Sequence, residues 1–152
     1  MREPVLLSIA STSALPHVLA IDDSATVCRI IEMHLRSAGF TVQSFADGVA
    51  ALQWLARSRA ALPPLIYLDI EMPRMDGYEV ARALHARADF AQTTLVLLSA
   101  RDGVGDRLKG RLAGAKMYIT RPFRAQDILA TTRFYLAAQA EPSLSITSLS
   151  AG

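Results

Sequence analysis

The sequence predicts an α/β domain in which helices cover both faces of a five-stranded parallel sheet. Short apolar runs recur along the chain and alternate with segments whose apolar residues follow helical spacing. The run at 65–68 holds only apolar and aromatic residues and leads directly into Asp69. Uninterrupted apolar runs of this kind are typical of strands that are buried on both faces of a parallel sheet.

The first strand is expected at 17–21, where an apolar run ends in the acids Asp22 and Asp23. Ser24 follows, and a serine at this place can cap a helix by accepting a hydrogen bond from an N–H of the first turn. Apolar residues at helical spacing continue up to Gly39, a residue type that commonly ends helices. The segment after the first strand is therefore predicted to be a helix.

The central strand is expected at 65–69, with a helix on either side of it in the chain. The preceding helix follows a short strand at 41–45, begins at Asp47 and ends before the prolines at 63–64. After the central strand, Pro73 disfavours helix at the residue before it. The chain must therefore turn before the next helix begins.

That next helix is expected at 77–87, because Asp76 followed three residues later by Glu79 forms a capping-box pattern. A strand at 94–98 follows, and then a helix at 103–113 that contains three glycines. Each interior glycine costs about 1 kcal/mol relative to alanine. This helix is therefore expected to be the least rigid.

The last predicted elements are a strand at 116–120 and a helix at 125–138, joined through Arg121-Pro122-Phe123. Five strands that alternate with five helices favour a flavodoxin-like, doubly wound sheet in the order 2-1-3-4-5.

Length and composition indicate one globular domain at 17–138, between a flexible extension at 1–16 and a disordered tail at 139–152. The chain has 152 residues, of which 51% are hydrophobic and 20% are charged. The net charge is only +2 and the basic residues form no run, so direct binding of nucleic acid is not expected. The single Cys28 excludes an internal disulfide. No apolar run approaches the ~20 residues that span a bilayer, and we expect a cytoplasmic protein without membrane contact.

The predicted order makes the first and third strands neighbours, and open α/β sheets bind ligands at the carboxyl ends of such strands. Asp22, Asp23 and Asp69 are therefore predicted to meet in one crevice. Crowded carboxylates repel one another unless a cation joins them, and hard oxygen donors suit Mg²⁺. Ser99 and Arg121, which follow the fourth and fifth strands, would face the same crevice. The set suggests a carboxylate nucleophile that accepts a phosphoryl group.

In order and spacing, these residues resemble the receiver domain of two-component response regulators, over about residues 17–138. The narrower segment from Ser99 to Gly114 resembles the stand-alone receivers of twitching motility and chemotaxis. The patterns that carry the resemblance are Asp22-Asp23, Asp69, Met72-Pro73-x-Met75-Asp76-Gly77, Leu98-Ser99-Ala100 and Tyr118-x-x-x-Pro122-Phe123.

The resemblance implies that Asp69 accepts a phosphoryl group from the phosphohistidine of a sensor histidine kinase. Asp23 and Asp69 would bind Mg²⁺ directly, together with the backbone carbonyl of Glu71, and Asp22 would act through water.

It also implies that Ser99 and Ala100 contact the phosphoryl group and that Tyr118 swings inward on activation. The turns that shape the site would depend on Pro73, Gly77 and Pro122.

The family has a lysine directly before the Pro-Phe pair, where this sequence has Arg121. Lysine is a compact point charge and arginine a longer planar fork, so the exchange is not automatically conservative. Lys116 lies five residues away, about 16 Å along a strand, and cannot take this place. Only two of the 16 basic residues are lysines. Two interpretations stay open: a general bias that keeps the charge, or altered phosphorylation and switching.

Glu71, two residues after Asp69, and Arg101, two residues after Ser99, should flank the crevice. A pair between them would hinder the water that hydrolyses the acyl phosphate. The alternative is that both side chains are solvated.

The sequence thus predicts a phosphorylation switch that acts by binding other proteins, and not an enzyme. The expected surface for a downstream protein comprises the Gly-rich fourth helix, the fifth strand and the last helix. On that helix Phe134, Tyr135 and Leu136 are consecutive, so at least one must point outward. A second copy of the chain is a further candidate partner.

Two other functions remain as alternatives. One is a receiver-like adaptor whose switching is impaired by Arg121. The other is a metal-dependent phosphatase of the haloacid-dehalogenase type, with Asp69 as nucleophile and Glu71 as the second acid. Those phosphatases lack the Asp22-Asp23 pair. A nucleotide or flavin binder is disfavoured because no Gly-rich loop follows the first strand.

Overall fold

The computed structural model describes residues 16–58, 61–101 and 103–137. Five parallel strands form one sheet in the order β2-β1-β3-β4-β5. This confirms the predicted flavodoxin-like arrangement. The strands are β1 (Val18–Ile21), β2 (Val42–Phe45), β3 (Leu65–Asp69), β4 (Thr94–Ser99) and β5 (Met117–Thr120).

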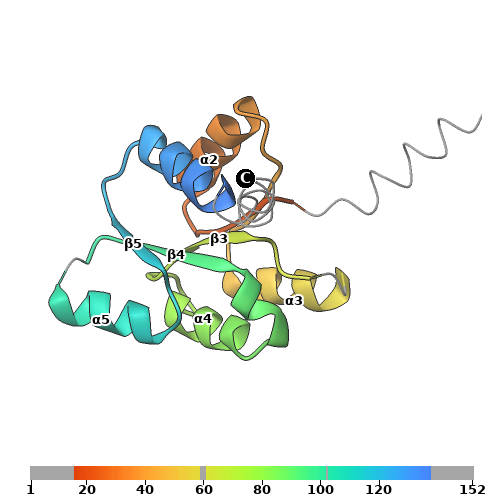
Figure 1. Cartoon of the computed structure of the whole chain (residues 1–152). Coiled ribbons are helices and arrows are strands. Elements are labelled where there is room, and N and C mark those ends of the chain that lie inside the picture. The colour runs from red at the N-terminus through yellow and green to blue at the C-terminus, as the bar shows by residue number, and fades with distance from the viewer. Residues whose placement is uncertain (1–15, 59–60, 102, 138–152) are drawn as a thin grey trace, which may run out of the picture.

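Helices cover both faces of this sheet (Figure 1). One face carries α2 and the helix of residues 125–137, and the other carries α3, α4 and α5. A 3₁₀ helix, η1, lies between α4 and β4. The helices with defined bounds are α2 (Ala25–Ser37), α3 (Gly48–Ser58), α4 (Gly77–His85), η1 (Ala88–Gln92) and α5 (Val104–Leu112).

Two helix starts have the predicted caps. The side chain of Ser24 accepts a hydrogen bond from Val27 N–H, so α2 begins where the sequence indicated. At α4, Asp76 and Glu79 form a reciprocal capping box with distances of 3.0 and 3.1 Å. Both caps satisfy N–H groups that have no partner within the helix.

One helix is shorter than predicted. The sequence indicated helix up to residue 87, but α4 ends at His85 and η1 follows. The carboxylate of Asp89 accepts hydrogen bonds from Leu62 N–H at 2.9 Å and from the Arg87 guanidinium at 3.0 Å. These contacts fix a turn where helical periodicity alone would continue. Likewise Gly103 is the N-cap of α5 and not an interior residue.

The core divides at the sheet because successive strand residues point to opposite faces. On the side of α3 and α4, the strands contribute Leu19, Ile21, Ile66, Leu68, Leu95 and Leu97. On the side of α2 and the last helix, they contribute Val18, Ala20, Leu65, Tyr67, Val96 and Leu98.

The last described helix is fixed to the sheet by a buried hydroxyl. Tyr67 Oη donates to the carbonyl of Ile128 at 3.0 Å and lies 2.7 Å from Thr132 Oγ1. Phe134, on the same helix, is 66% exposed, so one of the three consecutive apolar residues does point outward as predicted.

The predicted extension at 1–16, apart from residue 16, and the tail at 139–152 lie outside the described residues. Within the described ranges, no helix has both the length and the apolar character needed to cross a bilayer.

Candidate functional site

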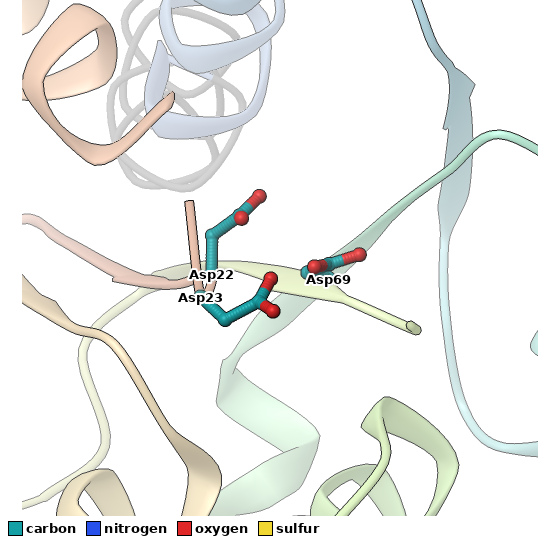
Figure 2. A group of neighbouring side chains, drawn as sticks. All are labelled: Asp22, Asp23 and Asp69. Atoms are coloured by element: carbon teal, nitrogen blue, oxygen red, sulfur yellow. The ribbon is translucent and has the colours of Figure 1, made fainter. Parts of the chain in front are cut away.

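The register of the sheet brings the candidate residues together at one edge, the one formed by the carboxyl ends of the strands. Ile21 pairs with Leu68, and Asp69 pairs with Leu98. The residues that follow β1 therefore lie beside the end of β3, and the end of β4 lies on its other side. Figure 2 shows Asp22, Asp23 and Asp69 grouped at this edge. One carboxylate oxygen from each lies within 4.8 Å of the other two.

Asp22 is held by the start of α2. Its Oδ1 accepts a hydrogen bond from Ser24 N–H at 2.9 Å, and its carbonyl accepts one from Cys28 Sγ at 3.2 Å. Its own N–H bonds to the carbonyl of Phe45 on β2. Asp22 is 1% exposed, whereas Asp23 is exposed. The cap residue Ser24 thus also orients a candidate site residue, a role that the sequence analysis did not assign.

The turn after β3 places Asp69 at the sheet edge. Gly77 N–H donates to the carbonyl of Ile70 at 2.8 Å, and Met75 N–H donates to the carbonyl of Pro73 at 2.7 Å. A Cβ on Gly77 would lie 2.4 Å from the carbonyl oxygen of Asp69. Only a glycine therefore allows α4 to start so close to the end of β3.

Arg121 joins the acids from the far side of the site. Its Nη2 forms a close ion pair with Asp22 Oδ2 and lies 3.3 Å from Asp69 Oδ1. Its backbone N–H donates to the carbonyl of Ser99 at 2.8 Å, and this bond fixes the position of the Arg121 backbone beside the end of β4. The Arg121-Pro122 peptide is cis. The longer arginine thus spans two carboxylates.

Burial dominates the electrostatics of the two inner acids. It raises the pKa of Asp69 to about 7, the charge of Asp22 adds to this rise, and the charge of Arg121 opposes it. Burial also raises the pKa of Asp22, against the hydrogen bond from Ser24 and the charge of Arg121. The desolvation of these carboxylates therefore outweighs the single cation beside them.

Ser99 and Glu71 close the site on the side of β4. The side chain of Ser99 is fully buried and donates a hydrogen bond to Glu71 Oε1 at 2.7 Å. Ala100 N–H donates to the same oxygen at 3.1 Å. The bond from Ser99 holds the pKa of Glu71 below its usual value.

The pair between Glu71 and Arg101, one of the two arrangements that the sequence left open, does not form. Neither described residue forms an ion pair with the other, because the loop after β3 directs the Glu71 carboxylate to the tip of β4. Sequence spacing places Glu71 and Arg101 beside the crevice, but it does not show whether Glu71 bonds Arg101 or Ser99.

Tyr118 lies on β5, behind this edge. Its ring packs against Gly110 of α5, where an added Cβ would lie 3.2 Å from the ring. Arg107 lies over the ring at 5.3 Å. The hydroxyl is buried and has no hydrogen-bond partner within the described ranges. Tyr118 thus has its polar end inside the fold.

The acids fit a hard divalent ion. Their oxygens converge from the loop after β1 and from the last residue of β3. Two of the three side chains are buried, and the cluster has more carboxylates than nearby cations. Carboxylate oxygens are the donors that Mg²⁺ takes in proteins, with water or phosphate completing the shell. The chain could hold Mg²⁺ through Asp22, Asp23 and Asp69.

This fold and this acidic edge define a receiver domain of the response-regulator type. The family model for the response regulator receiver domain matches residues 18–133. The chain belongs to this family, and the resemblance noted from the motifs is confirmed.

Curated relatives agree with this assignment. The chain is 35% identical over 119 residues to Protein PilG of Pseudomonas aeruginosa, an alignment that covers 78% of this chain and 86% of that one. It is 39% identical over 119 residues to Response regulator MprA of Mycobacterium leprae, which covers 78% of this chain and 50% of the relative. The chain thus spans most of PilG and about half of MprA.

Among solved structures, the chemotaxis protein CheY4 of Vibrio cholerae superposes with a TM-score of 0.72 at 28% identity. The match covers 80% of this chain and 99% of CheY4.

Proposed function

We propose that the protein is a stand-alone phosphorylation switch in which Asp69 accepts a phosphoryl group from a histidine kinase in the presence of Mg²⁺. The observation that carries this proposal is the convergence of Asp22, Asp23 and Asp69 within 4.8 Å at the edge of a receiver fold. Similarity to PilG, of which the chain covers 86%, supports a stand-alone role.

In the proposed transfer, a carboxylate oxygen of Asp69 bonds to phosphorus while the bond from phosphorus to the kinase's histidine nitrogen breaks. The nitrogen keeps the electron pair of that bond. Mg²⁺, when bound by Asp22, Asp23, Asp69 and the backbone carbonyl of Glu71, would neutralise the phosphoryl oxygens. Arg121, 3.3 Å from Asp69 Oδ1, supplies a further positive charge, which supports transfer despite the exchange of lysine for arginine.

The surface for a downstream protein is proposed on α5, β5 and the helix of residues 125–137. Large apolar side chains gather there: Val104 is 87% exposed and Leu112 is 77% exposed. Leu108, Met117 and Phe134 are exposed as well. Tyr118 and its contact with Gly110 connect this surface to the sheet. Val104, Leu108 and Leu112 follow one another at four-residue spacing on α5, and exposed apolar side chains on one helix face are typical of protein-binding surfaces.

The test is labelling of the purified chain by a small phosphodonor such as acetyl phosphate. Wild type is expected to take up one phosphoryl group with Mg²⁺ and none with EDTA, and Asp69→Asn is expected to take up none. Glu79→Gln is a matched control, because it removes one carboxylate while glutamine still completes the capping box of α4. Equal labelling of wild type and Asp69→Asn would refute the assignment.

The same labelled protein separates the switch from a constitutive adaptor. Affinity for a downstream partner that does not change on labelling would favour an adaptor whose Arg121 site no longer switches. Turnover of free phosphoesters would instead favour a phosphatase.

A further inference from the structure

The Glu71 carboxylate accepts the hydrogen bonds of two donors that a phosphoryl group on Asp69 would need. One of its oxygens accepts both the O–H of Ser99, at 2.7 Å, and the N–H of Ala100, at 3.1 Å. The backbone N–H of Glu71 donates to Asp69 Oδ1 at 3.1 Å. A single residue therefore contacts the proposed phosphoacceptor through its main chain and the tip of β4 through its side chain.

The two donors lie next to the place where phosphate would be added. Ser99 is the last residue of β4, and Asp69 pairs with the residue before it, Leu98. A phosphoryl group on Asp69 would bring three anionic oxygens to this edge, and each would need donors. Ser99 has only one hydroxyl proton. Its lone pairs already accept the N–H of Arg101 at 3.0 Å, so the proton that points to Glu71 is the one a phosphoryl oxygen would require.

Glu71 can leave this position. Its side chain is exposed, whereas Ser99 is fully buried. The carboxylate could therefore rotate into water and regain hydrogen bonds there, but Ser99 has no such alternative. An incoming phosphoryl group would also repel the carboxylate by charge.

Building on the function proposed above, we propose that Glu71 is an internal anion that occupies the donor pair of Ser99 and Ala100 and that phosphorylation of Asp69 must displace. Glu71 thereby opposes the bound state of any phosphoryl group or phosphoryl-like anion at this site. It is a positioning residue for Ser99, and it sets how readily the unmodified protein takes the anion.

The test uses beryllofluoride, a phosphoryl surrogate, titrated with Mg²⁺ into wild type and three variants. Binding is followed by the ¹⁵N–¹H signals of residues 99–101. Glu71→Ala removes the acceptor and the charge. Glu71→Asp keeps the charge on a side chain too short to reach Ser99. Glu71→Gln keeps the acceptor oxygen and removes the charge.

If occupation of the donors matters, Glu71→Ala and Glu71→Asp should both bind beryllofluoride about three- to tenfold more tightly than wild type. The gain is expected because, in wild type, Ser99 and Ala100 must first give up hydrogen bonds to a charged carboxylate, and such bonds are stronger than those to a neutral group. Glu71→Gln accepts weaker hydrogen bonds from the same donors, so its affinity should lie between those of wild type and Glu71→Ala. Before any ligand is added, the Ala100 N–H signal should move upfield in Glu71→Ala and Glu71→Asp, since a charge-assisted hydrogen bond is lost.

Other outcomes separate the two proposals. If wild type binds beryllofluoride and Glu71→Ala binds it no more tightly, the role of Glu71 is refuted and the phosphoacceptor assignment stands. If Glu71→Asp matches wild type while Glu71→Gln matches Glu71→Ala, charge repulsion alone acts and the occupation of the donors is refuted. If no form binds beryllofluoride, both proposals fail.

Discussion

Arg121 is the cation that balances the two buried acids of the site. Its Nη2 contacts Asp22 and lies 3.3 Å from Asp69, and its side chain is only 24% exposed. Removing one partner from a buried ion pair is more costly than the pair is worth, because the remaining charges stay desolvated. The positive charge of Arg121 therefore contributes to the stability of the metal-free protein.

Replacing Arg121 by alanine should lower the free energy of unfolding in EDTA, since Asp22 and Asp69 lose their counter-charge. The loss should be about 1–3 kcal/mol, below the roughly 3–5 kcal/mol of a fully buried pair, because the Arg121 side chain is 24% exposed. Saturating Mg²⁺ should reduce this loss by neutralising the same carboxylates. The measurement is urea unfolding followed by circular dichroism, with and without Mg²⁺.

Arg74→Ala is the matched control for that experiment. Arg74 forms an exposed pair with Asp47 at 3.5 Å, and its side chain is 80% exposed. Such pairs are worth roughly 0–1 kcal/mol, so this variant should stay close to wild type in both conditions. A loss in Arg121→Ala that is no larger than that of the control would contradict the counter-charge role.

At the residue scale, the sequence predicts which acids lie together but not which hydrogen bonds they form. Asp22, Asp23 and Asp69 could be placed together because the strand order alone makes the ends of β1 and β3 neighbours. The partner of Glu71 could not be chosen, since Arg101 and Ser99 are equally near in spacing. Only the path of the loop after β3 decides between them.

At the scale of elements, the start of α4 is the part of the fold that shapes the site. Gly77 packs directly on the end of β3, and an added Cβ would lie 2.4 Å from the carbonyl oxygen of Asp69 and 2.6 Å from the Cα of Ile70. Both are backbone atoms, which cannot move aside as a side chain can. The contact therefore couples the position of α4 to that of Asp69, the proposed phosphoacceptor.

Gly77→Ala should reduce the free energy of unfolding by about 1–3 kcal/mol, the usual cost of overpacking. It should also slow labelling of Asp69, because the strand end must shift. Gly105→Ala is the matched control: an added Cβ meets nothing within 4 Å there. Gly105 is the second residue of α5, so this change should be neutral or stabilise by less than the roughly 0.5–1 kcal/mol of a mid-helix position. Denaturant unfolding of both variants is the measurement, and a neutral Gly77→Ala would contradict the proposed packing constraint.

The elements themselves could largely be predicted, because each is marked by local chemistry. Apolar runs mark the strands, and Ser24, Asp76 and Glu79 mark two helix starts. The 3₁₀ helix η1 could not be predicted in this way. It depends on Asp89 bonding to Leu62, which is 27 residues away in the chain, and such a contact leaves no local pattern.

For the whole molecule, the sheet separates two apolar layers, and the acids of the site lie at the edge formed by the carboxyl ends of its strands. Cluster residues on both faces are buried, so the loops at the carboxyl ends of the strands can carry charges without disturbing the core. The acids at that edge are nevertheless partly desolvated, and their charge therefore acts on the stability of the whole fold.

The stability of the metal-free protein should consequently fall as pH rises from about 4 to about 7. Asp69 loses its proton near pH 4 in the unfolded chain, but burial raises its pKa to about 7 in the folded protein. Between these values the unfolded state binds fewer protons than the folded state, so deprotonation favours unfolding. The full shift corresponds to about 4 kcal/mol. Because Asp22 and Arg121 share this titration, about 2 kcal/mol is expected between pH 5 and pH 8.

Asp69→Asn should remove most of this loss, and Mg²⁺ at pH 8 should restore stability to wild type by binding the ionised carboxylates. The measurement is urea unfolding at pH 5 and pH 8, in EDTA and in Mg²⁺. Groups outside the site titrate alike in both proteins, so their effects cancel in the difference between wild type and Asp69→Asn. Asp22, whose charge acts on Asp69, remains part of that difference. An equal fall in both proteins would show that Asp69 is not the group whose desolvation sets the pH dependence.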